Sequence, residues 1–142
     1  MRDRVIATLL DRAEHEPYAR KLGIRVLELE PGRAVVEMAP RNDLRDIFDM
    51  THGGAIFSLI DEAFQLSCSS HGTVAVCLSM TVNYHNPPDV ESVLRAESRE
   101  IQRSRKTGTY EIKVTDEKNT LIASCQALAY RKPDPLPFLE GE

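Results

Sequence analysis

The residues of this chain that are best suited to chemistry lie in one short segment, which starts at His52, Gly53 and Gly54 and reaches Asp61 two helical turns later. Glycines at the start of a helix leave its first backbone N–H groups bare, and these groups have no acceptor within the helix. Such a terminus attracts an anion or a developing oxyanion. A carboxylate such as Asp61 can act as a general base or as a nucleophile.

The spacing between the glycines and Asp61 places them apart on one helix. At 1.5 Å per residue they are separated by roughly 10–12 Å, which is too far for one small reacting group to touch both. If two copies of the chain share a site, the glycine N–H of one copy can meet the Asp61 of the other. This reading predicts a dimer, whereas the competing interpretation of Asp61 is an ordinary solvated helix acid.

The segment at 50–70 is apolar around most of its circumference and therefore predicts a buried central helix, which is too short to span a bilayer. Its polar residues form one narrow stripe that we expect to be the only side open to water. The stripe consists of Ser58, Glu62, Gln65 and Ser69.

The flanking patterns predict an α+β fold in which an antiparallel sheet of about five strands wraps this helix. A helical period indicates an extra N-terminal helix at 1–16, before Pro17, and an alternating pattern around Pro31-Gly32 indicates a hairpin. The 40–50 stretch is typical of a loop, and a proline-rich, flexible tail is expected at 132–142. Further β-rich stretches lie at 74–84, 93–101, 110–114 and 121–130.

The composition is that of one ordinary globular domain spanning 1–142. The chain is 42% hydrophobic and 28% charged, and its net charge of −4 does not indicate a nucleic-acid partner. Neither a signal peptide nor a membrane segment is expected, and a cytoplasmic location is predicted. Cys68, Cys77 and Cys125 have no metal-type spacing, so they are expected to be small buried hydrophobes, and no metal is predicted.

Six stretches, taken in sequence order, carry a resemblance to a known family: His52-Gly53-Gly54, 57–64, 80–87, 94–97, 105–111 and 121–123. Together they resemble the hotdog-fold acyl-CoA thioesterases of the phenylacetic-acid-degradation (PaaI-type) family. The resemblance covers roughly residues 22–131. It implies the hotdog fold, a homodimer that often pairs into a homotetramer, and an acyl-CoA substrate hydrolysed without a cofactor at sites on the dimer interface.

The resemblance also implies residue roles. The Gly53 N–H polarises the thioester carbonyl, Asp61 of the other subunit acts as base or nucleophile, and His52 positions the loop. The family commonly carries Asn and Gly where this chain has Asp46 and Asp49, and Asp46 is counted here among the expected catalytic residues. Some relatives carry Ser or Thr where this chain has Cys77. The remaining expected substrate-binding residues are Gly54, Cys77, Asn83, Tyr84, Arg103, Arg105, Lys106 and Thr107.

Three alternatives stay open from the sequence. The first is a non-catalytic acyl-CoA-binding module, because Asp46 replaces the usual Asn. The second is an acyl-thioester dehydratase, because such enzymes have the same fold. The third is a structural dimerisation domain. For the basic turn at 103–106, an ordinary solvated turn is as reasonable as contact with the phosphates of CoA.

Overall fold

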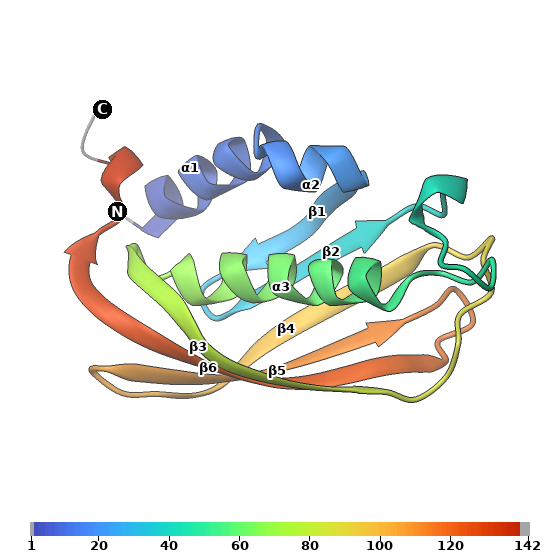
Figure 1. Cartoon of the computed structure of the whole chain (residues 1–142). Helices are drawn as coiled ribbons and strands as arrows, with labels where there is room; N and C mark the ends of the chain where they lie inside the picture. The colour runs from blue at the N-terminus through green and yellow to red at the C-terminus, as the bar shows by residue number, and fades with distance from the viewer. Residues whose placement is uncertain (1, 140–142) are drawn as a thin grey trace.

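The computed structural model describes residues 2–139, in which one curved antiparallel sheet wraps a single long helix (Figure 1). Two N-terminal helices lie on the side of the long helix away from the middle of the sheet. The helices are α1 (Arg2–Glu14), α2 (Pro17–Leu22) and α3 (Gly53–Ser69), with short 3-10 turns at Asn42–Leu44 and Pro137–Leu139. The strands are β1 (Ile24–Glu30), β2 (Arg33–Met38), β3 (Thr73–Tyr84), β4 (Leu94–Arg103), β5 (Thr107–Thr115) and β6 (Leu121–Pro135).

The sheet of the described chain has six strands in the order β1-β2-β4-β5-β6-β3, so the expected number of about five is corrected. The two-stranded hairpin before α3 is present, and all four β-rich stretches after α3 form strands of their own. The hairpin and these four stretches together account for all six strands, and β3, which pairs only with β6, lies at the edge of the sheet. The expected α+β arrangement around a central helix is confirmed.

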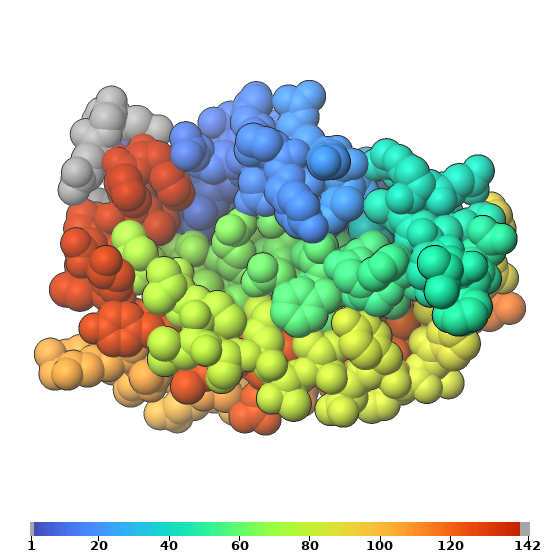
Figure 2. Space-filling model, in the orientation of Figure 1, coloured from blue at the N-terminus to red at the C-terminus, as the bar shows by residue number. Residues whose placement is uncertain are grey.

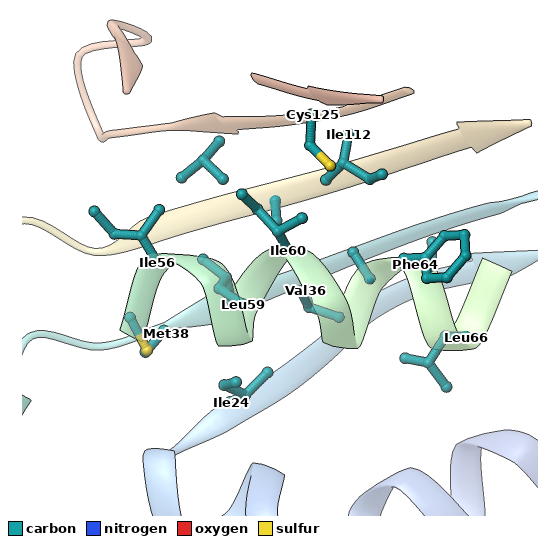
Figure 3. Close-up of a cluster of buried hydrophobic side chains, with 14 of the residues drawn as sticks. Ile24, Val36, Met38, Ile56, Leu59, Ile60, Phe64, Leu66, Ile112 and Cys125 are labelled. Atoms are coloured by element: carbon teal, nitrogen blue, oxygen red, sulfur yellow. The ribbon is translucent and has the colours of Figure 1, made fainter. Parts of the chain in front are cut away.

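The hydrophobic core lies between α3 and the concave face of the sheet (Figure 3). Leu59, Ile60 and Phe64 of α3 are almost fully buried there against side chains of the strands. The Phe64 ring meets the Tyr110 ring edge-to-face with centroids 5.5 Å apart, a favoured aromatic geometry. The apolar pattern of the 50–70 segment thus produces the buried central helix that it predicts.

The expected polar stripe of α3 is wrong for two of its four residues, Glu62 and Ser69, which water does not reach. Glu62 and Ser69 retain only 7% and 9% of their exposure, because the α1–α2 layer covers that side. The exposed side chains are Phe57, Asp61 and, from the stripe itself, Gln65. We call this line of α3 the open face, and Figure 2 shows α3 uncovered between the N-terminal helices and β3.

Both ends of the described chain are more ordered than the sequence pattern indicates. After α1, a second helix begins at Pro17, in the first-turn position that proline tolerates, and stops at Gly23 in the left-handed conformation. Of the tail expected to be flexible, β6 continues to Pro135 and Leu136 is buried beside α1. Residues 140–142 of that tail lie outside the described residues.

Candidate active site

His52 caps the N-terminus of α3. Its backbone is extended, and its Nδ1 accepts the Gly54 N–H at 2.8 Å. A neutral imidazole whose Nδ1 is an acceptor carries its proton on Nε2. His52 therefore accepts a hydrogen bond from one bare N–H of the helix, and its own Nε2–H remains a donor on the other side of the ring.

Gly53 keeps the free donor of this terminus. Its N–H meets no acceptor among residues 2–139, whereas the Gly54 N–H is satisfied by His52. The Tyr84 hydroxyl donates to the Gly53 carbonyl at 3.1 Å, and a Cβ added at Gly53 would be 3.8 Å from the Tyr84 ring. Of the expected residues, Gly53, Gly54, His52 and Tyr84 are thus brought together around one unsatisfied N–H.

Asp61 lies on the open face of α3, two turns after Gly53. Partial burial of the Asp61 carboxyl raises its pKa, and the negative charge of Glu16 raises this pKa further. A carboxyl whose pKa moves toward neutrality is a stronger base near pH 7. No basic side chain is paired with Asp61 in the described residues, so nothing within them opposes this shift.

Cys77 and Asn83, both on β3, have different positions relative to Asp61. Cys77 is exposed, which corrects its expected burial; Cys68 and Cys125 are buried. Burial of part of the Cys77 side chain raises the pKa of the thiol, and the charge of Asp61 raises it further. Asn83 pairs with Ser124 and lines a polar hollow on the outer face of the sheet, away from α3 and Gly53.

The basic turn between β4 and β5 lies at the other end of the sheet from Gly53 (Figure 1). It carries Arg103, Arg105, Lys106 and Thr107. The turn is held in place, because the Thr107 carbonyl accepts the Ser104 N–H at 2.8 Å and the Lys106 carbonyl accepts the Arg131 N–H at 2.7 Å. One copy of the chain therefore does not bring the basic turn to the Gly53 N–H.

Comparison with known proteins now identifies the family. The family model described as the thioesterase superfamily matches residues 48–123, which is more than half of the chain and includes Gly53 and Asp61. The chain belongs to the thioesterase superfamily. This confirms the expected class of enzyme, a thioester hydrolase.

Individual relatives agree with this assignment. A protein of Archaeoglobus fulgidus whose name places it among the esterases is 35% identical over 82% of this chain and 75% of its own. The acyl-coenzyme A thioesterase PaaI of Escherichia coli is 29% identical over 83% of this chain and 84% of its own. The structure of the E. coli PaaI protein superposes with a TM-score of 0.84 at 27% identity, covering 92% of this chain and 96% of that one. The expected PaaI-type hotdog fold is thereby confirmed.

In this thioesterase, Asp46 organises the loop before His52. Its Oδ1 accepts the N–H groups of Phe48 and Met50 at 2.8 and 3.1 Å, and its own N–H donates to the Met50 carbonyl at 2.7 Å. Asp49 has a φ of 60°, the left-handed region that glycine adopts without strain and that Asp tolerates. The two departures from the family pattern thus lie in one tight loop that leads into the helix cap.

Sequence reasoning missed a contact between α2 and the first turn of α3. Ser58 Oγ donates to the Gly54 carbonyl at 2.9 Å and lies 2.9 Å from the Tyr18 hydroxyl. Because the hydrogen of Ser58 is used on Gly54, Tyr18 is the donor to Ser58. The two residues border a hollow of about 250 Å³ beside His52. Pro17 after Glu16 was the available signal, since proline suits the first turn of a new helix.

No group of three or more His, Cys, Asp and Glu side chains in the described part of the chain is arranged to hold a metal ion. Within the same residues, no helix is both long and apolar enough to cross a membrane.

Proposed function

We propose that this chain hydrolyses acyl-CoA thioesters to the free acid and CoA. The Gly53 N–H polarises the thioester carbonyl, and Asp61 either removes a proton from the attacking water or attacks the carbonyl carbon itself. The C–S bond then breaks and the CoA sulfur takes a proton. Where Asp61 has attacked, the acyl group is left as an anhydride on Asp61, and water hydrolyses this anhydride to the free acid and the regenerated carboxylate. The observation that carries the proposal is the Gly53 N–H, which is left without an acceptor at the helix terminus while the adjacent Gly54 N–H is capped.

The site is proposed to be shared by two copies of the chain. Gly53 and Asp61 lie two turns apart on α3, and the basic turn lies at the far end of the sheet. In addition, β3 is a twelve-residue edge strand on which Val76 and Leu78 are 47% and 56% exposed. Long apolar edge strands are rarely left open in folded proteins. Pairing of β3 between two copies covers this edge and supplies the second half of each site.

In this arrangement, Arg103, Arg105 and Lys106 of one copy serve the site that contains Gly53 of the other. Guanidinium groups bind phosphate oxygens in pairs and an ammonium group binds them as a point charge, so the turn suits the phosphates of CoA. The likeness to the E. coli acyl-coenzyme A thioesterase supports the same substrate class. Pairing of dimers into tetramers and a cytoplasmic location stay predictions.

The test is release of free thiol from a panel of aliphatic and aryl acyl-CoAs, comparing the native chain with Asp61→Asn. This substitution keeps the size of the side chain and removes the base. Asp134→Asn, at an exposed position on β6, is the matched control. We expect a loss of 10²–10⁴-fold in kcat for Asp61→Asn, the usual contribution of a general base, and native rates for the control.

Equal rates for the native chain and Asp61→Asn contradict the role given to Asp61. Binding of CoA esters with no thiol release from any of them contradicts hydrolysis and favours the non-catalytic binding module. Formation of an enoyl product, followed by its absorbance, favours the dehydratase instead.

A further inference from the structure

The first turn of α3 begins with two glycines, and glycine has more backbone freedom than any other residue type. An N–H that stabilises a developing oxyanion is effective because its direction is fixed before the reaction starts. If the Gly53 N–H has this role, the peptide groups next to it must be held by other contacts. Three peptide groups join His52 to Ala55, and their hydrogen bonds show which side chains hold them.

The peptide group between Gly53 and Gly54 is held at both ends. Its carbonyl, which belongs to Gly53, accepts the Tyr84 hydroxyl at 3.1 Å. Its N–H, which belongs to Gly54, donates to His52 Nδ1 at 2.8 Å. A Cβ added at Gly54 would lie 3.1 Å from His52 Nδ1, so the imidazole ring packs directly against this glycine. Rotation of the peptide group therefore breaks one hydrogen bond to β3 and another to the cap.

The next peptide group, between Gly54 and Ala55, is also held at both ends. Its N–H donates to the His52 carbonyl at 3.0 Å. Its carbonyl accepts Ser58 Oγ at 2.9 Å, and the Tyr18 hydroxyl donates to the same Ser58 oxygen at 2.9 Å. A hydroxyl that accepts one hydrogen bond is a stronger donor in the next, because hydrogen bonds in a chain polarise one another. Tyr18 of α2 thus acts on the start of α3 through Ser58.

The peptide group between His52 and Gly53 is held at its carbonyl alone. The His52 carbonyl accepts the N–H of Ala55 at 3.0 Å and that of Ile56 at 3.3 Å. Among the N–H and C=O groups of these three peptide groups, the Gly53 N–H is the one without a partner within residues 2–139. The contacts around it therefore fix its direction and leave it free to donate.

We propose that Tyr18, acting through Ser58, fixes the direction of the Gly53 N–H toward the thioester carbonyl. Both are positioning residues, because they act on the reaction through the first turn of α3. This inference rests on the proposed function, since it takes the Gly53 N–H as the donor to the substrate. Tyr18 lies before residues 48–123, which match the family model, so the N-terminal helical layer contributes to the site from outside that match.

The competing interpretation is that the contact between Tyr18 and Ser58 only docks α2 on α3. Tyr18 is 59% exposed, so water can solvate its hydroxyl when Ser58 does not, and little of the folding free energy depends on this contact. The two interpretations differ in what a substitution changes. Docking alone affects stability, whereas positioning lowers kcat.

The first experiment measures kcat and KM for thiol release by the native chain, Ser58→Ala, Ser58→Thr and Tyr18→Phe. We expect kcat to fall by about 10-fold in Ser58→Ala and about 3-fold in Tyr18→Phe, where water can take the place of the hydroxyl, with KM within about twofold of native. Ser58→Thr restores the native kcat, because a threonine hydroxyl can also donate to the carbonyl four residues earlier.

Tyr130→Phe is the matched control for the loss of a tyrosine hydroxyl. Tyr130 is 39% exposed on β6, and its hydroxyl makes no hydrogen bond within residues 2–139, so native rates are expected. An unchanged kcat in Ser58→Ala, a loss in Ser58→Thr as large as in Ser58→Ala, or a rise in KM at native kcat overturns the proposal.

The second experiment combines substitutions to test the path of the effect. If Tyr18 acts through Ser58, adding Tyr18→Phe to Ser58→Ala lowers kcat no further. If Ser58 acts through the Gly53 N–H, adding Ser58→Ala to Gly53→Pro, which has no N–H at this position, also lowers kcat no further. Losses that multiply in either pair overturn the proposed path.

The third experiment separates this inference from the proposed function. The Ala55 N–H belongs to the same peptide group as the Gly54 carbonyl, so its hydrogen exchange, followed by NMR, reports the hold of Ser58 without any substrate. We expect exchange at Ala55 to be about 10-fold faster in Ser58→Ala and native in Ser58→Thr. If the native chain hydrolyses no thioester, the function fails while this measurement still decides whether Ser58 holds the turn. Equal exchange in the native chain and Ser58→Ala overturns the inference.

Discussion

Asp61 and Glu62 are neighbours in the sequence and have opposite environments in the structure. Asp61 stands on the open face of α3, whereas Glu62 is 7% exposed beneath the α1–α2 layer. Successive helix residues point about 100° apart, so a cover over one side of α3 buries Glu62 and leaves Asp61 exposed. The pair shows that a carboxylate's role in this fold depends on which face of α3 has been covered within the chain.

The role of the free N–H at the start of α3 can be tested most sharply by substitutions at Gly53. Gly53→Pro removes the free N–H, and proline is accepted at the first position of a helix, where no intrahelical bond is lost. His52 already has the extended backbone that a residue before proline requires. We expect kcat to fall by about 10²–10³-fold, as for the loss of one oxyanion donor.

Gly53→Ala is the matched control for this substitution. It adds a Cβ that has ordinary contact distances to the Tyr84 ring at 3.8 Å, and it keeps the N–H. We expect its kcat to stay within about threefold of the native value, because the donor is intact. Equal losses in Gly53→Pro and Gly53→Ala, in steady-state thiol-release assays, contradict the donor role.

The need for a second copy at the open face can be tested with mixed dimers of Gly53→Pro and Asp61→Asn. In a mixed dimer, one site combines the intact Gly53 of one copy with the intact Asp61 of the other. Random pairing makes half of the dimers mixed, so co-expression restores about a quarter of the native activity. Differently tagged copies allow the mixed dimer to be purified and assayed alone. Activity no higher than that of the parent variants contradicts a shared site.

Substitutions in the basic turn are expected to have a smaller effect on catalysis, and they also test whether two copies share the site. Arg105→Ala combined with Lys106→Ala removes two cations proposed to contact the phosphates of CoA from the other copy. We expect KM to rise by about 10-fold with kcat little changed, and the rise to shrink at high salt, where charges are screened. Lys118→Ala with Lys132→Ala is the control for net charge. If KM stays at the native value, the basic turn does not contact CoA and is an ordinary solvated turn.

Much of the fold could be predicted because its signals are local. The apolar run at 50–70 and the turn at Pro31-Gly32 each depend on residues close in sequence, and both elements form where expected. Each of the six strands coincides with a stretch recognised from the sequence, whereas the pairing of edge strand β3 with β6 depends on the tertiary fold. At the site, His52, Gly53 and Tyr84 do come together, whereas Asn83 and the basic turn are placed away from them.

The sequence by itself determined that one helix would be buried, that it would begin with two glycines, and that an acid would follow two turns later. These properties follow from residue types at fixed spacing along a single helix. Only the tertiary structure decided that His52 takes the Gly54 N–H and leaves that of Gly53 free, and that Glu62 is covered while Asp61 is open. Each of these depends on a cap geometry or on a layer of helices from a distant part of the chain, and no spacing within α3 encodes either.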